Sequence, residues 1–336
     1  MEGEIEALLK VSAISSALMA YARFSSAKIP PGFLRLLFLL PVISSLFFLP
    51  LGFSSIHLRT ISGFFLAWLA VFKLLLLSFD AGPLSPSLPF LSFLPVALLP
   101  VNLRAATRRK PPHLLPTAIK ALLFSFLVSF YSYRYRFPLF LLLLLYCFHI
   151  YLTAELVYAG AAFLASGLLG LNLEPQFDAP YRTTSLQDFW GRRWNLVVTT
   201  VLRPSVYNPI RRRWGSAAGF LATFLVSGVM HELMVYYVTL APPTGEMLCF
   251  FLLHGVCTVL EVRLKKAAGN REGGWRVHPA AATGATLGFV VATGFRLFLP
   301  PMMRNGSDER VLEECEAMIG FFKKGSEAIL GRFRLQ

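Results

Sequence analysis

Several long apolar stretches constrain the fold of this chain more than any other feature. A helix needs about 20 mostly apolar residues to cross the hydrocarbon core of a bilayer. Only 15% of the 336 residues are charged, whereas a typical soluble domain carries about 25%. We therefore predict an all-α polytopic integral membrane protein with about eight transmembrane helices. The predicted spans are residues 5–23, 33–53, 60–79, 117–132, 138–160, 217–240, 246–262 and 280–299.

The stretch 88–101, LPFLSFLPVALLPV, is apolar but shorter than a span. Its prolines interrupt the hydrogen-bond ladder of a helix, so we expect a re-entrant segment rather than a crossing. The start, MEGEIEALLK, is acidic, whereas a cleavable signal peptide begins with basic residues, which predicts a retained first span. The chain shows no internal repeat and no low-complexity linker. We therefore expect one membrane-embedded domain over residues 1–336.

Basic residues gather in three segments between the predicted spans, at 102–116, 172–216 and 263–278. Lys and Arg concentrate on the cytoplasmic side of membrane proteins. We therefore place these loops in the cytoplasm and the tail 301–336 on the opposite side. The net charge of +14 then reflects this bias and attraction to anionic lipid headgroups. Because the charge is spread over separate loops, it indicates the lipid bilayer as partner and not a nucleic acid.

The segment SLQDFWGRRWN, residues 185–195, places polar residues among large aromatic ones outside any predicted span. Ser185 followed by Asp188 predicts a helix N-terminus with a capping box, and Pro204 predicts its end. Between them we expect a cytoplasmic amphipathic helix at the membrane interface. The helical spacing puts one set of residues on a polar face and another on an apolar face: Asp188, Arg192, Asn195 and Thr199 against Trp190, Trp194, Val197 and Val201.

Two interpretations of this helix remain open from the pattern alone. It is either an interfacial anchor with solvated charges, or part of an active site. Asn195 favours a site, because an anchor gains little from an amide, whereas acyl transfer needs neutral hydrogen-bond donors near the reacting carbonyl.

A second candidate site lies in FLVSGVMHELMVYYV, residues 224–238. His231 and Glu232 fall near the middle of a predicted span, where ionisable groups are expensive and usually functional. Ser227 and Gly228 precede His231 on its own face, and they either let another helix approach or leave room for a ligand. The alternative for His231 is a buried imidazole bonded to a neighbouring helix. For Glu232 we expect a structural ion pair.

Other features of the sequence predict no further chemistry. The four cysteines form no C-x-x-C pair, which suggests neither a zinc site nor a redox motif. A G-x-S-x-G motif and a Gly-rich phosphate loop are also absent from the sequence. Hydrogen bonds inside the bundle account for the remaining polar residues of the spans, which are Lys73, His149, Glu155, His254, Thr258 and Glu261.

Three motifs together resemble the membrane-bound O-acyltransferases, and among them the plant wax synthases, which are long-chain-alcohol O-fatty-acyltransferases. The motifs are SLQDFWGRRWN (185–195), RPSVYNP (203–209) and SGVMHE (227–232). The resemblance implies that Asn195 and His231 form the catalytic pair. It further implies an enzyme of lipid biosynthesis in the endoplasmic reticulum membrane, which transfers a fatty acyl group from acyl-CoA to a long-chain alcohol and forms a wax ester.

The implied mechanism needs no metal or redox cofactor, because the thioester supplies the driving force. His231, as a neutral imidazole, would take the alcohol proton, and Asn195 would donate to the developing oxyanion. Arginine suits phosphate, so we expect the CoA head near the Arg-rich loop. The predicted substrate-binding residues are Asp188, Trp190, Arg192, Arg193, Trp194, Arg211, Arg212 and Arg213. Alternative functions are a sterol or diacylglycerol O-acyltransferase, or a membrane transporter with His231 in a proton path.

Overall fold

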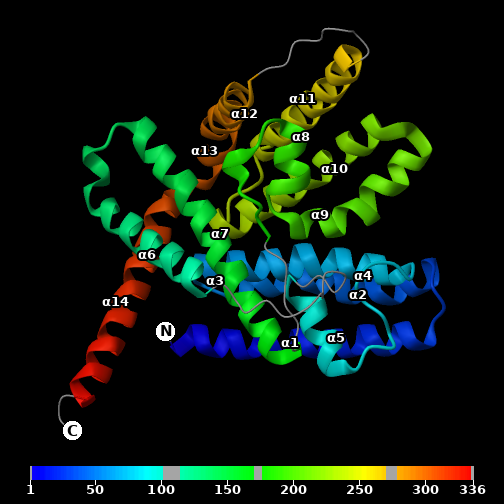
Figure 1. Cartoon of the computed structure of the whole chain (residues 1–336). Helices are drawn as coiled ribbons and strands as arrows, with labels where there is room; N and C mark the ends of the chain where they lie inside the picture. The colour runs from blue at the N-terminus through cyan, green and yellow to red at the C-terminus, as the bar shows by residue number, and fades with distance from the viewer. Residues whose placement is uncertain (1, 101–113, 170–175, 270–277, 334–336) are drawn as a thin grey trace.

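The computed structural model describes residues 2–100, 114–169, 176–269 and 278–333, and every regular element in these ranges is helical (Figure 1). Seven of the described helical stretches are long and apolar enough to cross a membrane, which confirms a polytopic membrane protein. These stretches are Gly3–Lys28, Phe33–Gly52, Ile56–Ser78, Leu139–Gly167, Leu196–Thr239, Glu246–Ala267 and Pro279–Met302.

The N-terminal third forms a layer of helices that lie side by side in the lower half of Figure 1. Its core is built by apolar faces of α1, α2, α4 and α5, with Met19, Leu39, Leu74 and Phe93 fully buried. The elements are α1 (Glu2–Lys28), α2 (Phe33–Phe48), η1 (Leu49–Gly52), α3 (Ile56–Ser62), η2 (Gly63–Ala70), α4 (Val71–Ser78) and α5 (Phe90–Leu98).

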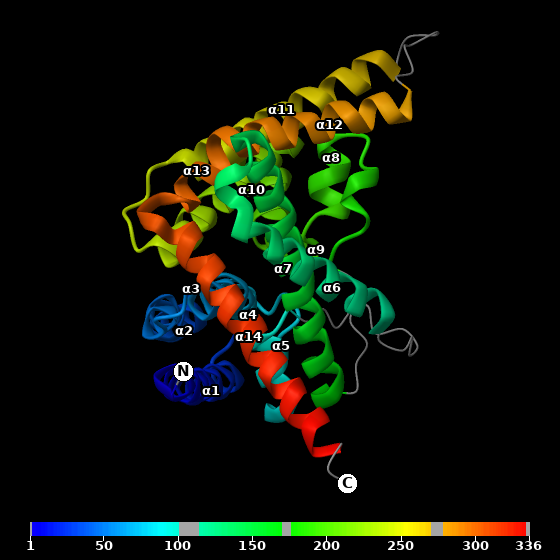
Figure 2. The ribbon, with the colours of Figure 1, turned by 90° about the vertical axis from the view of Figure 1, so that its left-hand side faces the viewer.

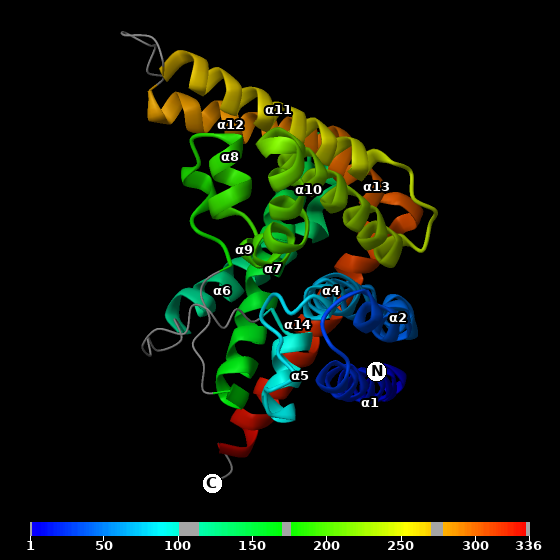
Figure 3. The ribbon, with the colours of Figure 1, turned by 90° about the vertical axis from the view of Figure 1, so that its right-hand side faces the viewer.

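Most of the remaining helices lie above this layer in Figure 2 and Figure 3, with α11 and α12 side by side at the top of both views, whereas α7 and α14 run down beside the layer. The middle elements are α6 (Leu114–Phe130), η4 (Tyr131–Arg136), α7 (Leu139–Leu169), η5 (Pro180–Arg182), α8 (Leu186–Asp188), η6 (Phe189–Arg193), α9 (Leu196–Leu202), η7 (Arg203–Tyr207) and α10 (Asn208–Thr239). The C-terminal elements are α11 (Glu246–Gly269), α12 (Pro279–Thr293), η8 (Gly294–Phe298), α13 (Leu299–Met302), η9 (Arg304–Gly306) and α14 (Ser307–Phe333).

The predicted span 117–132 falls almost entirely in α6, which has only 17 residues. A helix of that length measures about 25 Å, less than the thickness of the hydrocarbon core.

The proline-rich stretch 88–101 was predicted not to cross the membrane. The structure agrees with this prediction, because α5 has only 9 residues. Lys73 donates to the carbonyls of Val96 and Leu99 at the end of α5, at 2.7 Å and 2.5 Å. This buried lysine therefore has the hydrogen-bonding role that we predicted for it.

The prediction of a single amphipathic helix over residues 185–201 is wrong. Ser185 caps the segment as expected, since its hydroxyl accepts from the Asp188 backbone N–H at 3.0 Å. The helix then breaks at Trp194, which is extended, and Asn195, which has a left-handed φ of 46°. Asparagine tolerates this conformation better than most residues, because its short polar side chain reduces the steric cost.

The helix end predicted at Pro204 is also wrong, because helical structure continues from α9 through η7 into α10. Pro204 lies in the π-helical segment η7. A wider π turn interrupts the regular hydrogen-bond ladder, so the missing proline N–H can be accommodated there. The bend in this region lies instead at Gly215, whose φ of 85° and ψ of 173° depart from helical values.

Close contact between α10 and α11 depends on two glycines. A Cβ on Gly228 would lie 3.0 Å from the Cα of Leu248, and a Cβ on Gly255 would lie 2.9 Å from the Cβ of Phe224. The sequence left two roles open for Gly228, to let a neighbouring helix approach or to leave room for a ligand. The structure supports the first role. This approach positions the apolar side chains of α11 against the C-terminal half of α10, next to His231.

The tail helix α14 returns across the molecule and contacts α3 and α6 (Figure 2). Its Glu314 carboxylate accepts hydrogen bonds at the start of α3, from the Ser55 hydroxyl at 2.8 Å and the Ile56 backbone at 2.8 Å, and from both the backbone and Nδ1 of His57 at 3.1 Å and 2.7 Å. Burial acts to raise the pKa of Glu314, but these bonds, foremost that from the His57 ring, lower it to about 2. An ionised carboxylate thus joins the tail to the N-terminal layer.

The cytoplasmic placement of the basic loops stays a prediction. Arg104, Arg108, Arg109 and Lys110 of the first loop, and Arg271 and Arg276 of the third, lie outside the described residues.

Candidate active site in the helix bundle

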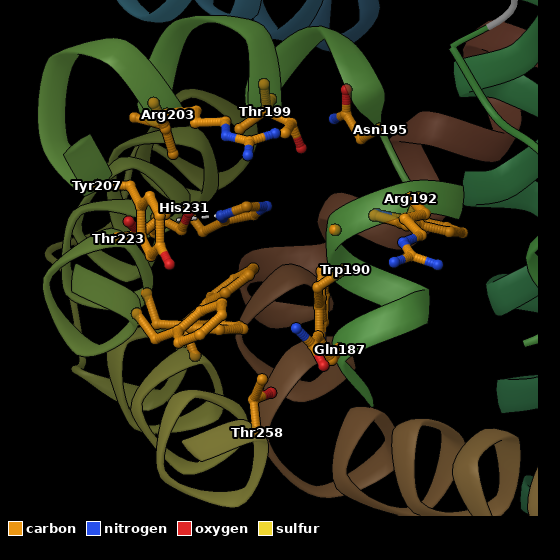
Figure 4. Close-up of a pocket in the computed structure, with 18 of the residues that line it drawn as sticks. Gln187, Trp190, Arg192, Asn195, Thr199, Arg203, Tyr207, Thr223, His231 and Thr258 are labelled. Carbon is orange, nitrogen blue, oxygen red and sulfur yellow. Dashed lines mark hydrogen bonds between the residues drawn. The ribbon is translucent and has the colours of Figure 1, made fainter. Parts of the chain in front are cut away.

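A cavity of about 360 Å³ lies between η2, the segment 187–207, α10 and α11 (Figure 4). Aromatic and aliphatic side chains form about half of its lining residues, and polar side chains form most of the rest. Both predicted catalytic residues lie on this wall. The lining residues are Trp68, Gln187, Trp190, Gly191, Arg192, Trp194, Asn195, Val198, Thr199, Leu202, Arg203, Tyr207, Phe220, Thr223, Phe224, Ser227, His231, Phe251 and Thr258.

His231 enters the cavity from the C-terminal half of α10 and is fixed on two sides by aromatic rings. Phe251 of α11 stacks on the imidazole with ring centroids 4.0 Å apart, and Trp68 of η2 meets it edge to face at 4.9 Å. The Nδ1 atom lies 2.7 Å from the carbonyl oxygen of Ser227. A carbonyl only accepts, so Nδ1 carries the proton in this bond, and in the neutral ring Nε2 keeps a lone pair that none of the described residues occupies.

Asn195 faces the same cavity from the break between η6 and α9 (Figure 4). The hydroxyl of Tyr158, a buried residue of α7, donates to its Oδ1 at 2.7 Å. This bond fixes the orientation of the amide, because it occupies the oxygen and leaves the two N–H donors of Nδ2 for another partner. Figure 4 shows the amide nitrogen on the side of Asn195 that faces His231. The site therefore offers an acceptor at His231 and a neutral donor at Asn195.

Trp190 forms another part of the wall and is held by a hydrogen-bonded chain. Its indole N–H donates to Nδ1 of His254 at 3.0 Å, and Nε2 of His254 lies 2.9 Å from the hydroxyl of Thr293. That hydroxyl donates to the Phe289 carbonyl at 2.7 Å, so it accepts from His254. His254 thus has the bundle-lining role predicted from its sequence position. Thr258, one turn further along α11, reaches the cavity.

The predicted substrate-binding residues separate into three groups. Trp190, Arg192 and Trp194 line the cavity, together with Arg203, which the sequence did not single out. Asp188 and Arg193 instead pair with each other, with Nε and Oδ2 2.5 Å apart.

Arg193 also holds the preceding loop, because it donates to the carbonyl of Asp178 at 3.1 Å. Arg211, Arg212 and Arg213 are exposed at the start of α10, before the bend at Gly215, and do not line the cavity. Their contact with substrate stays a prediction.

Glu232 does not form the ion pair that we expected among the described residues. Its carboxylate accepts instead from the backbone N–H groups of Thr244 and Leu248, at 3.2 Å and 3.1 Å, and so holds the turn into α11. Glu261 has a similar role, since it accepts from the Leu186 backbone at 2.7 Å and ties α8 to α11. Glu155 pairs with Lys120 at 2.7 Å. Glu232 and Glu261 thus hold segments that border the site, whereas Glu155 joins α6 to α7, and none of the three lines the cavity.

Sequence reasoning missed Trp68, Tyr158 and Phe251 as parts of the site. Each lies in a continuous apolar run, where periodicity gives no signal that distinguishes a cavity wall from a core. Trp68 is buried, and its indole nitrogen has no hydrogen-bond partner among the described residues. Buried N–H groups are nearly always paired, so this donor beside His231 is a further polar group available at the wall of the cavity.

A histidine and an oriented amide face one cavity inside membrane-length helices, which is the arrangement expected of an intramembrane enzyme for amphiphilic substrates. Residues 173–253, which contain both Asn195 and His231, match the membrane-bound O-acyl transferase family. Among relatives, a long-chain-alcohol O-fatty-acyltransferase of Simmondsia chinensis is 41% identical over 98% of this chain and 99% of its own length. A protein of Arabidopsis thaliana named "Probable long-chain-alcohol O-fatty-acyltransferase 2" is 43% identical over 98% of this chain and 100% of its own length.

An acyl-CoA–sterol O-acyltransferase of Arabidopsis thaliana is 38% identical over 90% of this chain and 92% of its own length. The chain belongs to the membrane-bound O-acyl transferase family. The resemblance read from the three sequence motifs is thereby confirmed, and the transporter alternative is not supported.

Proposed function

We propose that this protein is a long-chain-alcohol O-fatty-acyltransferase, which transfers a fatty acyl group from acyl-CoA to the hydroxyl of a long-chain alcohol and forms a wax ester. Relatives of that name, similar over nearly the full length of both chains, support the proposal. The single structural observation that carries the chemistry is that His231 and Asn195 face one cavity, with a free Nε2 on the first and an oriented amide on the second.

The reaction follows from these two groups. Nε2 of His231 accepts the hydroxyl proton while the alcohol oxygen attacks the thioester carbonyl, and the Nδ1–H···O bond to Ser227 stabilises the resulting imidazolium. The negative charge that develops on the carbonyl oxygen receives a hydrogen bond from Nδ2 of Asn195. The tetrahedral intermediate then collapses with cleavage of the C–S bond. His231 returns its proton to the departing CoA sulfur, so the products are a neutral ester, a thiol and the original imidazole.

The walls of the cavity suit the two substrates. The apolar side chains of the lining take the alkyl chains, whereas Arg192 and Arg203 offer guanidinium groups to the phosphates of CoA. The protein is an integral membrane protein, and we place it in the endoplasmic reticulum on the basis of its predicted role in lipid synthesis.

The test is product analysis on microsomes from a host that lacks such enzymes. Radiolabelled acyl-CoA is offered with a long-chain alcohol, a sterol or a diacylglycerol at equal concentration. We expect wax ester as the main product, and its loss in a His231→Ala protein present at the same level in the membrane. Sterol ester as the main product would instead favour the second candidate, a sterol acyltransferase, which the 38% identical relative supports. No ester from any acceptor would refute the assignment.

A further inference from the structure

Apart from the cavity, three potential metal ligands from distant parts of the chain meet in the bundle. They are His57 at the start of α3, His149 in α7 and Cys315 in α14, and their ligand atoms all lie within 4.8 Å of one another. His149 and Cys315 are buried, with exposed fractions of 7% and 0%. None of the three lines the catalytic cavity, so the proposed reaction does not explain why they meet.

The geometry at His57 resembles that of a metal-binding histidine. Its Nδ1 donates to the Glu314 carboxylate at 2.7 Å, and its Nε2 lies 3.4 Å from Sγ of Cys315. A carboxylate that accepts from one ring nitrogen fixes the tautomer and directs the lone pair of the other nitrogen, as in carboxylate–histidine–zinc triads. Glu314 also accepts from Ser55 and from backbone N–H groups, so it orients His57 and is not free to act as a ligand.

His149 supplies an independent observation. Its Nδ1 is fully buried and has no hydrogen-bond partner among the described residues. The ring packs between Phe124 and Tyr131, with centroids 5.1 Å and 5.8 Å away. A buried polar atom without a partner is costly, and a metal ion bound to this nitrogen would remove that cost.

We propose that His57, His149 and Cys315 bind a zinc ion that fastens the tail helix α14 to the membrane-embedded body. Two imidazoles and a thiolate are preferred zinc ligands, with Zn–N of about 2.0 Å and Zn–S of about 2.3 Å. In a tetrahedral site these lengths place sulfur and nitrogen about 3.5 Å apart, close to the 3.4 Å between Cys315 and His57. The wider separation of up to 4.8 Å closes if the His149 side chain moves inward by about 1.5 Å.

Three protein ligands leave a fourth position for water. The zinc ion would stabilise the position of the tail helix α14 and would not contact the substrate. It joins a residue of α14 to residues of α3 and α7, beside the bonds that Glu314 already makes to α3.

The test is the metal content of the full-length protein, purified in detergent without chelators and under reducing conditions. We expect about one zinc ion per chain in the wild type, and loss of most of it in Cys315→Ser and His149→Ala. Cys147→Ser is the matched control, because Cys147 lies two residues from His149 in the same helix and is not part of the ligand group. Its zinc content should stay at the wild-type level.

A second measurement reads the thiolate ligand directly and does not depend on activity. Co²⁺ added to the metal-free wild type should give a sulfur-to-cobalt charge-transfer band, which Cys315→Ser should lack. Monodisperse gel filtration shows that each variant is folded. A folded wild type that carries no zinc and gives no such band would overturn the site and leave an S–H···N hydrogen bond between Cys315 and His57. Zinc retained in Cys315→Ser would overturn it equally.

Discussion

The bond between Tyr158 and Asn195 gives the sharpest test of the candidate site. The change Tyr158→Phe removes one hydroxyl and keeps the ring that packs against Phe64 and Phe177 at 5.9 Å and 5.8 Å. It leaves Oδ1 of Asn195 without its donor at 2.7 Å. The amide is then free to rotate, and its N–H groups no longer face the reacting carbonyl in every molecule.

The size of the effect follows from the cost of an unpaired buried acceptor, which is about 1–3 kcal/mol. If that free energy is lost from the transition state alone, kcat falls by about 5- to 150-fold. KM for either substrate should change little, because the hydroxyl is occupied by Asn195 and does not bind the ground state. The assay is the rate of ester formation over a range of acyl-CoA and alcohol concentrations, normalised to protein in the membrane.

Tyr151→Phe is the matched control, because its hydroxyl also lies on α7 but donates to Glu155 at 2.7 Å, away from the cavity. It should keep a near-normal kcat. A double-mutant cycle with Asn195→Gly adds a second criterion, since glycine tolerates the left-handed backbone and lacks the amide. Once the amide is gone, Tyr158→Phe should cost little more. A kcat for Tyr158→Phe equal to that of Tyr151→Phe would refute the orienting role.

Three further changes test other parts of the structure. His231→Ala should lower ester formation by about 10²–10⁴-fold at unchanged protein level, since it removes the base; a near-normal rate would contradict that role. Arg203→Gln should raise KM for acyl-CoA more than Arg212→Gln, because Arg203 lines the cavity and Arg212 does not; equal effects would indicate that Arg212 also meets CoA. Gly228→Ala should destabilise the protein by about 1–3 kcal/mol by overpacking against α11, measured by thermal inactivation. Gly288→Ala, where an added Cβ meets nothing within 4 Å, should not.

The sequence by itself determined the class of the protein, and it singled out His231 and Asn195 as the two principal polar groups of the candidate site. The length of an apolar run and the presence of a histidine within it are local properties, and bilayer thickness converts them directly into spans. The N-cap at Ser185 was predictable for the same reason, because donor and acceptor lie three residues apart. The three motifs also sufficed to recognise the family.

Tertiary structure alone decided which groups complete the site. Tyr158 reaches Asn195 from another helix, and Trp68 approaches His231 from a segment far earlier in the chain. No periodicity records such pairings, because an apolar run gives the same pattern whether a residue packs in a core or borders a cavity. The break at Asn195 was missed for a related reason. Local spacing favoured one continuous helix, but contacts with α7 and α11 hold this segment in two pieces and turn the amide toward the histidine.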